Sequence, residues 1–575
     1  MKILGLTSFI HDSSAALLDD GRIVAAADEE RFNREKFTGH FPRQALKFCL
    51  AQGGSKLSEI DWLAFYWNPW SGMVRRTWMM ATHLPHSLAF FKKKAAYEPA
   101  IRGDFGCWWN MVNLARVMQQ AFPDEKTKFR CRFVDHHLAH AASAYYVSPW
   151  DEAMILSLDG TGEWISTLMA MGAGRHIRKI KEIAYPHSLG VLYGAITQFL
   201  GYQIYQDEWK VMGLAACGTP RQADQVRRLI HCEQGRFRLN LDYFNFQYAD
   251  KGLWFGPRFA ELFGAPRRHD EPIETERFAD LAASFQLVTE EAGLSLVRHL
   301  LRNGGGCKRL CLAGGVALNA VLNGKILAET EVEELFVQPA AGDAGAALGA
   351  ALYLHHEVLN GHRSGPTRHV YLGPDYHEDR MLAALRAQNL AAEKQDDIER
   401  RAANLLAGGK ILGWFQGRME YGPRALGNRS ILADPRRLQM KDALNAKVKY
   451  RERFRPFAPS VLAERAGEYF ERGGSFPFMT VVLPVKPEKR AVIPAVVHHD
   501  GTGRLQTVTK EANPRFYGLI QEFDRVTGVP VLLNTSFNLQ GEPIVCTPED
   551  AVSTFLRSGL DALVLGDYLC VKTKG

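Results

Sequence analysis

Residues 2–28 read KILGLTSFIHDSSAALLDDGRIVAAAD, and residues 153–184 repeat the same arrangement as AMILSLDGTGEWISTLMAMGAGRHIRKIKEIA. Each copy predicts a buried strand, a small polar loop, a second strand, a tight turn and a third strand, which together form a meander. The polar loops, His11–Ser14 and Asp159–Gly162, present backbone amides that suit a phosphate chain. Two unrelated β-hairpins would give the same pattern, so the repeat needs support from the rest of the chain.

Two strand–loop–helix segments follow in the same half of the sequence. KRLCLAGGVALNAVLNGKIL places Gly314 and Gly315 in its loop, and ELFVQPAAGDAGAALGAALYLHH places Asp343 at its joint. A glycine pair permits close approach of the backbone to a ligand. Asp159 and Asp343 both follow predicted strands at the mouth of an α/β sheet, which is where open sheets bind ligands.

A histidine pair lies one helical turn apart in residues 134–146, VDHHLAHAASAYY. His136 and His140 stand at i and i+4 near the start of a predicted helix, so that both imidazoles point to one side. A carboxylate from an adjacent strand end would then complete a metal site. In the alternative, one histidine caps or packs the helix and the other is solvated. His137 is ambiguous as well, since it would pair with His140 at i+3.

The composition is that of a large enzyme with more than one domain. The chain has 575 residues, of which 46% are hydrophobic and 23% are charged, an ordinary globular balance. Its nine cysteines are scattered, without the C-x-x-C pairs of a zinc ribbon, which favours reduced thiols and a cytoplasmic location. The N-terminus lacks the pattern of a signal peptide. The apolar residues 78–94 are interrupted by His and Pro, which predicts an amphipathic helix or lid and no membrane span.

The second half of the chain carries a concentrated positive charge. Eleven basic and four acidic residues lie between Arg418 and Arg455, interleaved with Gly, Pro and aromatic residues. Such a run is usually a solvated face, but it also suits nucleic acid or a small phosphorylated substrate. Residues 360–380 are rich in Gly, Pro, His and Arg, which predicts a linker there between a first domain, 1–359, and a second α/β domain, 381–575.

Nine motifs in chain order resemble the O-carbamoyltransferases of antibiotic and nodulation-factor biosynthesis, the family of the tobramycin and cephamycin enzymes. They are HDSSAALL, EERFNREK, HHLAHAASAYY, LDGTGEW, EWKVMGLAACG, AGGVALNA, GRMEYGPRALGNRSILADPR, FRPFAPSVL and LNTSFNLQGEPIV. The likeness runs from Lys2 to about Gly566. Cys217 and Arg453 depart from the family pattern, and neither is a proposed base or ligand.

The resemblance implies an α/β protein with a duplicated, actin-like (ASKHA) N-terminal domain and a YrdC-like C-terminal domain. The C-terminal domain would join carbamoyl phosphate and ATP into carbamoyl-AMP, releasing pyrophosphate and phosphate. The N-terminal domain would pass the carbamoyl group to a hydroxyl of a small-molecule acceptor, a natural product or a sugar. Because water destroys a carbamoyl adenylate, both steps need dry surroundings.

In the C-terminal domain, two multiply charged substrates require cations whose geometry fits phosphate oxygens. Arg424 and Lys449 are the expected catalytic cations. The residues expected to bind carbamoyl phosphate are Arg418, Arg451, Arg455, Arg504, Asn534 and Ser536. Other basic residues of this segment are expected to be surface charge, namely Arg436, Arg437, Lys441 and Arg453.

In the N-terminal domain, the family pattern places a divalent metal on His136, His140, Asp159 and Asp343. The resemblance indicates Fe²⁺, with Mn²⁺ or Zn²⁺ as alternatives, and Mg²⁺ would accompany ATP. His11 is expected near the acceptor or carbamoyl group, where a histidine can act as a general base, and Lys36 near the phosphates. From the residues alone, His11 is a turn residue and Lys210 an ion-pair partner of Asp207 or Glu208. The residues expected to contact the nucleotide are Gly160, Gly162, Lys210, Gly213, Gly314, Gly315 and Asn319.

Three other readings compete with this one. A tRNA-modifying transferase would need a broad basic face on the first domain, and KKK at 92–94 is the longest basic run there. A hydrogenase-maturation carbamoyltransferase would carry paired C-x-x-C fingers, which are absent from the sequence. A nucleotide-binding scaffold would need neither the metal set nor the arginines. We therefore expect ATP, carbamoyl phosphate and a hydroxylated acceptor as partners, without nucleic acid or membrane, and a homodimer is left open.

The stretch from Trp62 to Trp109 is rich in aromatic residues and lies outside the family motifs, and seven of its aromatic residues are candidates for a binding role. They suit an acceptor pocket for a sugar ring or a fused apolar skeleton, and the alternative is that most belong to the core or a domain interface. They are Trp67, Trp70, Trp78, Phe90, Phe91, Trp108 and Trp109.

Overall fold

The structure is a computed structural model that describes residues 1–82, 84, 103–125, 128–247 and 252–572. The helix expected over residues 78–94 is described only at its beginning, where α3 covers Met73–Thr82; Phe90 and Phe91 lie outside the described residues. No helix among the described residues is long and apolar enough to cross a membrane.

The chain divides into two compact units. Unit 1 comprises residues 1–30 and 37–367, and unit 2 comprises residues 31–36 and 368–575. The division after Thr367 falls within the range 360–380. The six residues 31–36 group with unit 2 although their neighbours in the sequence on both sides belong to unit 1.

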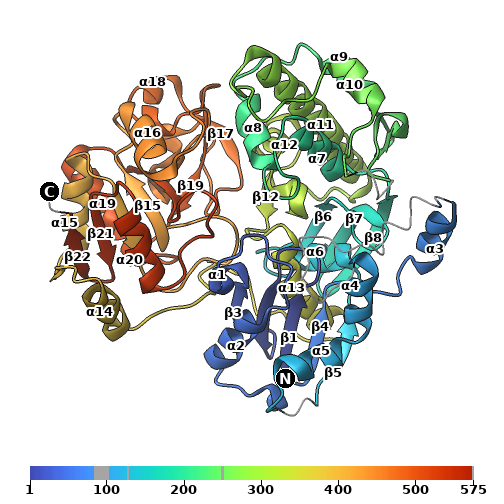
Figure 1. Ribbon diagram of the computed structural model, residues 1–575, viewed down its shortest axis with the longest axis horizontal. Coiled ribbons are helices and arrows are strands. Elements are labelled where there is room, and N and C mark those ends of the chain that lie inside the picture. The colour runs from blue at the N-terminus through green and yellow to red at the C-terminus, as the bar shows by residue number, and fades with distance from the viewer. Residues whose placement is uncertain (83, 85–102, 126–127, 248–251, 573–575) are drawn as a thin grey trace. The chain divides into compact units, whose positions relative to one another are not determined.

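Unit 1 contains two five-stranded sheets of the same design (Figure 1). The first has the order β3-β2-β1-β4-β5 and the second the order β8-β7-β6-β11-β12. In each, three antiparallel strands form the predicted meander. A fourth strand pairs in parallel with the first strand of the meander, and a fifth pairs in parallel with the fourth. The repeat predicted from the sequence is therefore confirmed. The strands are β1 (Lys2–Thr7), β2 (Ser14–Asp19), β3 (Arg22–Asp28), β4 (Trp62–Phe65), β5 (Arg130–Phe133), β6 (Glu152–Leu158), β7 (Ile165–Ala173), β8 (His176–Ala184), β11 (Arg309–Ala313) and β12 (Glu334–Val337).

Helices pack closely against these sheets because small residues line the contacts. Gly5 of β1 faces the carbonyl of Ala347 on α13, where an added Cβ would lie 1.9 Å from the oxygen, and Gly349 of α13 faces the carbonyl of Ala139 on α6 at 1.8 Å. Gly5 brings α13 onto β1, and Gly349 brings α13 against α6, so that the first residues of these two helices lie close together. The main helices of the unit are α2 (Arg43–Gln52), α4 (Gly103–Val112), α5 (Leu114–Ala121), α6 (His136–Tyr145), α7 (Leu189–Phe199), α8 (Glu208–Ala215), α10 (Pro257–Phe263), α11 (Glu276–Asn303), α12 (Ala320–Glu329) and α13 (Asp343–Tyr353).

Unit 2 is built on an eight-stranded mixed sheet with the order β13-β22-β21-β14-β15-β20-β16-β19. Its strands are β13 (Glu393–Lys394), β14 (Leu412–Phe415), β15 (Arg429–Ala433), β16 (Ala458–Leu462), β19 (Gln506–Val508), β20 (Val531–Ser536), β21 (Ala562–Leu565) and β22 (Tyr568–Val571). Helices and strands both contribute to this unit, and its main helices (Figure 1) are α14 (Glu378–Ala387), α15 (Ile398–Ala407), α16 (Gln439–Leu444), α19 (Pro514–Thr527) and α20 (Pro548–Arg557). The whole protein is thus of the mixed α/β class.

Candidate metal centre and cation cluster

Four side chains of unit 1 converge on one point. His136 is the first residue of α6, His140 stands one turn later, Asp159 follows the end of β6, and Asp343 is the first residue of α13. One ligand atom from each of the four lies within 4.8 Å of the others. Both histidines are fully buried. The geometry therefore brings together all four residues expected at the metal.

The donor atoms fit a divalent cation. The Nε2 atoms of His136 and His140 lie 3.0 Å apart, and the His136 Nε2 lies 3.0 Å from Asp159 Oδ2 and 3.6 Å from Asp343 Oδ1. Four ligands at metal bonds of about 2.0–2.2 Å stand roughly 3.4 Å from one another in a tetrahedral site. Two imidazoles with two carboxylates suit Fe²⁺, Mn²⁺ or Zn²⁺ better than a soft metal.

Backbone groups hold the ligands in place. Gly315 donates its N–H to Asp159 Oδ1 at 2.8 Å, and Glu163 accepts the N–H of His136 at 3.0 Å and so caps α6. Gly162 lies directly against His136, because an added Cβ would be 3.0 Å from its Cβ. Gly314 has a φ of +87° and faces the carbonyl of Leu158 at 2.2 Å from an added Cβ, so only glycine fits there.

The charges of the cluster stabilise one another. Burial disfavours every charged form, but opposite charges dominate. His136 and His140 hold the pKa of Asp159 well below its usual range, and His136 and His11 lower the pKa of Asp343. The two carboxylates in turn raise the pKa of His140 to about 9 despite its burial. In contrast, burial and the neighbouring histidines lower the pKa of His137, whose nitrogens contact Ser157 Oγ and the Ile165 carbonyl outside the cluster.

His11 lies at the rim of this cluster. Its Nε2 is 3.8 Å from Asp343 Oδ2 and its Nδ1 is 3.2 Å from Asp12 Oδ2. Although burial opposes it, the charge of Asp343 and the contact with Asp12 raise the pKa of His11 to about 10. The ring of Tyr205 lies over His11 with 4.9 Å between ring centroids. His11 is thus within reach of whatever binds the metal.

Glu208 supports the Tyr205 turn and has a pH-dependent charge. It accepts the N–H of Tyr205 at 2.6 Å, and burial raises its pKa from 4.5 to about 7. Because the folded protein binds this proton more tightly than the unfolded chain does, Glu208 contributes fully to the free energy of unfolding below pH 4.5. This contribution is lost as the pH rises through 7. We expect Glu208→Gln to remove about 1–2 kcal/mol of pH dependence between pH 5 and 8, a value reduced for partial exposure. Urea unfolding at pH 5 and pH 8 measures this difference, and Glu261→Gln, at an exposed position, is the control. If the free energy of unfolding changes with pH equally in Glu208→Gln and wild type, the expectation is wrong.

The residues expected to contact the nucleotide differ in their surroundings. Gly160 faces open space beside Tyr205, whereas Gly314 and Gly315 pack against β6 and Asp159 as described above. Asn319 caps α12 through the N–H of Leu322 and donates to Gln286. Lys210 forms an ion pair with Asp207 at 2.8 Å, which is the alternative that the sequence left open, and Gly213 lies on α8 three residues later.

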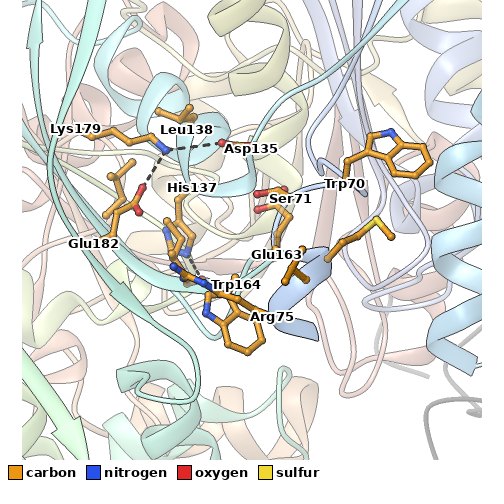
Figure 2. A pocket seen from close by; sticks show the side chains of 15 residues that line it. Trp70, Ser71, Arg75, Asp135, His137, Leu138, Glu163, Trp164, Lys179 and Glu182 are labelled. Atoms are coloured by element: carbon orange, nitrogen blue, oxygen red, sulfur yellow. Dashed lines mark hydrogen bonds and ion pairs between the residues drawn. The ribbon is translucent and has the colours of Figure 1, made fainter. Parts of the chain in front are cut away.

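A pocket of about 360 Å³ opens beside the start of α6. Trp70 and Trp164 contribute indoles, and Asp135, Lys179 and Glu182 are joined by ion pairs of 3.8 and 2.9 Å (Figure 2). Of the aromatic residues considered for an acceptor pocket, Trp70 lines this one.

The other described aromatic residues of that set take three different places. Trp67 is buried against His136 with 5.2 Å between ring centroids. Trp108 is half-buried and packs on Trp70. Trp78 and Trp109 are exposed. Neither prediction for the set, a pocket or a core, therefore covers all of its members.

Unit 2 gathers six basic side chains, which we call the cation cluster. These side chains lie close enough together to lower one another's pKa values. Besides burial, Arg451, Arg455 and Lys36 lower the pKa of Lys449, and Arg424 and Arg451 lower that of Arg504. The cluster comprises Lys36, Arg424, Lys449, Arg451, Arg455 and Arg504. Lys36 therefore lies with the cations of unit 2, whereas the sequence placed it in the transfer site.

Two arginines of the cluster have no partner. Within the described part of the chain, neither Arg424 nor Arg504 forms a hydrogen bond or an ion pair, and the Nε of each is buried. Burial lowers the pKa of Arg424 to about 10. Lys449, by contrast, donates to the carbonyls of Ser536 and Asn538. Partly buried guanidinium groups without counter-ions cost free energy, and an anion-binding site presents such groups before its ligand arrives.

Three of the other residues expected to bind carbamoyl phosphate are engaged with the protein. Arg418 donates to the carbonyls of Gly373 and Leu372. Asn534 is buried and donates to Ser460 Oγ and Gln506 Oε1, while its own Oδ1 is buried without a partner. Ser536 Oγ donates to Asn538 Oδ1. Arg418 thus anchors a loop through its side chain.

Removing one unpaired cation should stabilise the ligand-free protein. We expect Arg504→Met to raise the free energy of unfolding by about 1–2 kcal/mol, because the methionine removes a half-buried charge that lies near two like charges. Urea unfolding in chloride buffer measures this value. The same variant should lose most of the rise in melting temperature that pyrophosphate gives to wild type. A less stable Arg504→Met protein would show that the guanidinium is satisfied at rest.

Comparison with known proteins completes the description of these sites. The profile described as "Carbamoyltransferase N-terminus" matches residues 2–352, and that described as "Carbamoyltransferase C-terminus" matches residues 403–572. The chain belongs to the carbamoyltransferase family. It is therefore a transferase enzyme. The four candidate metal ligands and the cation cluster lie within the matched regions of this carbamoyltransferase.

Similar proteins come from bacteria and an archaeon. An uncharacterized protein of Synechocystis sp. is 43% identical, covering 99% of this chain and 97% of that protein. The nodulation protein NolNO of Sinorhizobium fredii is 41% identical, covering 98% and 79%. An uncharacterized protein of Methanocaldococcus jannaschii is 33% identical, covering 100% of both. Among solved structures, T. kodakarensis HypF is 15% identical over 63% of this chain and 48% of that one, with a TM-score of 0.32, too low to support an argument about this carbamoyltransferase.

Sequence reasoning missed several residues that shape the sites of this carbamoyltransferase. Asp12 contacts His11, Glu163 caps α6, and Glu208 supports Tyr205. Asp12 and Glu163 stand next to named site residues in the motifs HDSSAALL and LDGTGEW, so their positions were visible although their partners were not. Glu208 begins the motif EWKVMG, where the sequence suggested it only as an ion-pair partner of Lys210 and gave no sign of its hydrogen bond to Tyr205.

Proposed function

We propose that this carbamoyltransferase is an ATP-dependent O-carbamoyltransferase that works through carbamoyl-AMP. The observation that carries the proposal is the cation cluster, in which Arg424 and Arg504 are half-buried, bury their Nε atoms and have no partner among the described residues. A site with this excess of positive charge suits two substrates that both carry phosphate. The metal cluster of unit 1 supplies a second site of different chemistry.

Unit 2 would form the adenylate. Water attacks the phosphorus of carbamoyl phosphate and the P–O bond to the carbamoyl oxygen breaks, which gives carbamate and phosphate. A carbamate oxygen then attacks the α-phosphorus of ATP, carried with Mg²⁺, and pyrophosphate leaves. Arg424 and Arg504 would bind the phosphate oxygens, and Lys449, with Arg451 and Arg455 near it, would stabilise the charge that develops on the leaving groups. Ser536 and Asn538 hold the amine of Lys449.

Unit 1 would carry out the transfer, in which the oxygen of the acceptor attacks the carbamoyl carbon and AMP leaves. His136, His140, Asp159 and Asp343 would hold the divalent ion, with Fe²⁺ as the first candidate. When bound, this ion supplies positive charge for the phosphate of the adenylate and offsets the carboxylates that raise the pKa of His11. His11 at the rim would then take the proton of the acceptor hydroxyl as general base.

Several finer expectations fit this proposal. The identical strand order of the two sheets in unit 1 is consistent with an actin-like, duplicated domain, and the mixed sheet of unit 2 with a YrdC-like one. All nine cysteines are free thiols, which agrees with a cytoplasmic enzyme. The acceptor would be a hydroxylated small molecule, a natural product or a sugar.

Pyrophosphate release tests the proposed function. Purified protein supplied with ATP and carbamoyl phosphate should release pyrophosphate slowly without an acceptor, because water intercepts the adenylate. Neither substrate alone should give it. Screening hydroxylated metabolites by mass spectrometry for the gain of one carbamoyl unit then identifies the acceptor. Absence of pyrophosphate with both substrates present, in protein loaded with Fe²⁺ or Mn²⁺, would reject the adenylate mechanism.

A further inference from the structure

The segment Glu29–Gly39, which we call the strap, belongs to both units. Its middle, residues 31–36, groups with unit 2, while its two ends group with unit 1. The strap begins directly after β3 and contains the short helix α1 (Glu30–Asn33). Each part of it makes specific contacts within its own unit.

The middle of the strap anchors to two loops of unit 2. Arg34 donates to the carbonyls of Ile544 and Pro543 at 2.7 and 2.9 Å, and its Nε lies 3.6 Å from Asp550 Oδ1. Phe32 packs against the buried cluster of Met419, Ile544 and Cys546. The strap is therefore held on unit 2 by hydrogen bonds, charge and apolar contact together.

These anchors lead directly to the cation cluster. Arg31 is buried and donates to the carbonyl of Gly422 at 2.9 Å, two residues before Arg424. Lys36, at the far end of the middle segment, is close enough to Lys449 to lower its pKa. The strap thus fixes the loop that carries Arg424, and it also contributes Lys36 to the cation cluster.

The ends of the strap hold the loop that carries His11. The N–H of Ser13 bonds to the Thr38 carbonyl at 2.9 Å, the N–H of Glu29 bonds to the Ser13 carbonyl at 2.8 Å, and the N–H of Phe9 bonds to the Gly39 carbonyl at 2.9 Å. Residues on both sides of His11 are therefore hydrogen-bonded to the strap.

The backbone of both segments is unusual. Phe9 and Asp12 in the His11 loop, and Arg34 and Phe37 in the strap, have φ values of 79°, 51°, 63° and 56°. Non-glycine residues occupy this left-handed region only where surrounding contacts impose it. Because each segment is held by the other or by unit 2, loss of the strap's anchors would let both relax.

We propose that the strap is a positioning element shared by the two candidate sites, so that its anchors on unit 2 set the geometry of the cation cluster and of the His11 loop together. The proposal rests on the two-step function given above. Arg34 is the anchor to test, because it forms no part of either site and contacts both loop carbonyls and Asp550.

The first measurement is pyrophosphate release from ATP and carbamoyl phosphate. Arg34→Ala should lower kcat/KM for carbamoyl phosphate at least tenfold. Arg34→Lys keeps the charge but loses the paired N–H donors of the guanidinium group, so its kcat/KM should lie between the values for Arg34→Ala and wild type. Arg380→Ala is the matched control, since Arg380 pairs with Glu549, next to Asp550, and should leave the rate within twofold. If Arg34→Ala and Arg380→Ala behave alike while wild type is active, the strap has no positioning role. Inactivity of wild type would instead reject the proposed function.

The second measurement is hydrogen exchange of metal-free protein, with pyrophosphate as the probe. Pyrophosphate should slow exchange of the amides of residues 9–13 at least threefold in wild type and in Arg380→Ala, but not in Arg34→Ala. This readout does not depend on catalysis, so it also judges the strap if wild type proves inactive or Arg34→Ala is poorly active. Unchanged exchange at residues 9–13 in wild type would overturn the shared role, even if Arg34→Ala had slowed the first step.

Discussion

Arg424→Ala is expected to reduce pyrophosphate release from ATP and carbamoyl phosphate by about 100- to 1,000-fold, the range typical of losing one preorganised charge in a site. The reason lies in the unpaired state of Arg424. Its half-buried side chain has its pKa lowered to about 10 by desolvation and contacts no counter-ion among the described residues. A guanidinium group without a protein partner can bind the phosphate oxygens of a substrate. Coupled spectrophotometric detection of pyrophosphate measures the loss.

The matched control for this variant is Arg437→Ala. Arg437 belongs to the same basic run, but its half-exposed side chain lies 3.6 Å from Asp434, and its loss should change the rate less than threefold. Transfer from chemically supplied carbamoyl-AMP should survive in Arg424→Ala. If this variant loses both steps equally, the assignment of Arg424 to adenylate formation is wrong.

His136→Ala is expected to separate the two steps in the opposite sense. Removing one of two imidazoles from the cluster leaves three ligands, and we expect metal content after dialysis to fall at least tenfold. Carbamoyl transfer should fall by about 100-fold or more because the adenylate phosphate loses its cation. Pyrophosphate release should stay within threefold of wild type, since the cation cluster is untouched.

Metal analysis by mass spectrometry and single-turnover transfer assays check this expectation. His137→Gln is the control, because His137 stands on the same helix but contacts Ser157 and Ile165 in place of the cluster. Treating wild type with a chelator should reproduce the His136→Ala result, and adding Fe²⁺ or Mn²⁺ should reverse it in wild type alone. Full metal content in His136→Ala would mean that the four residues are not the ligands.

Local patterns in the sequence were enough to predict much of this architecture. The meanders of unit 1 follow from alternation and turn residues, and the start of α6 at His136 follows from the i, i+4 pair. The convergence of Asp159 and Asp343 follows from the rule that the parallel strands of one sheet, here β6, β11 and β12, end at the same edge. The expected metal residues came together for that reason.

What the sequence did not predict depends on contacts between distant segments. Arg418 and Arg424 belong to one basic run, but one binds the carbonyls of Gly373 and Leu372 and the other is unpaired. Composition cannot distinguish them, because the difference lies in where a loop directs the side chain. The same holds for Lys36. It lies near Lys449 although the two residues are far apart in the sequence. A long-range contact of this kind leaves no periodic pattern.

The repulsion among the six basic groups of unit 2 has a practical consequence for enzymology. Arg424 and Arg504, which contact no counter-ion among the described residues, will bind small oxyanions that the solution offers. Sulfate from a precipitation step or an orthophosphate buffer at tens of millimolar would therefore act as a competitor and inflate the apparent KM for carbamoyl phosphate. Kinetic constants for this enzyme should be compared only between assays run in chloride or acetate at matched ionic strength.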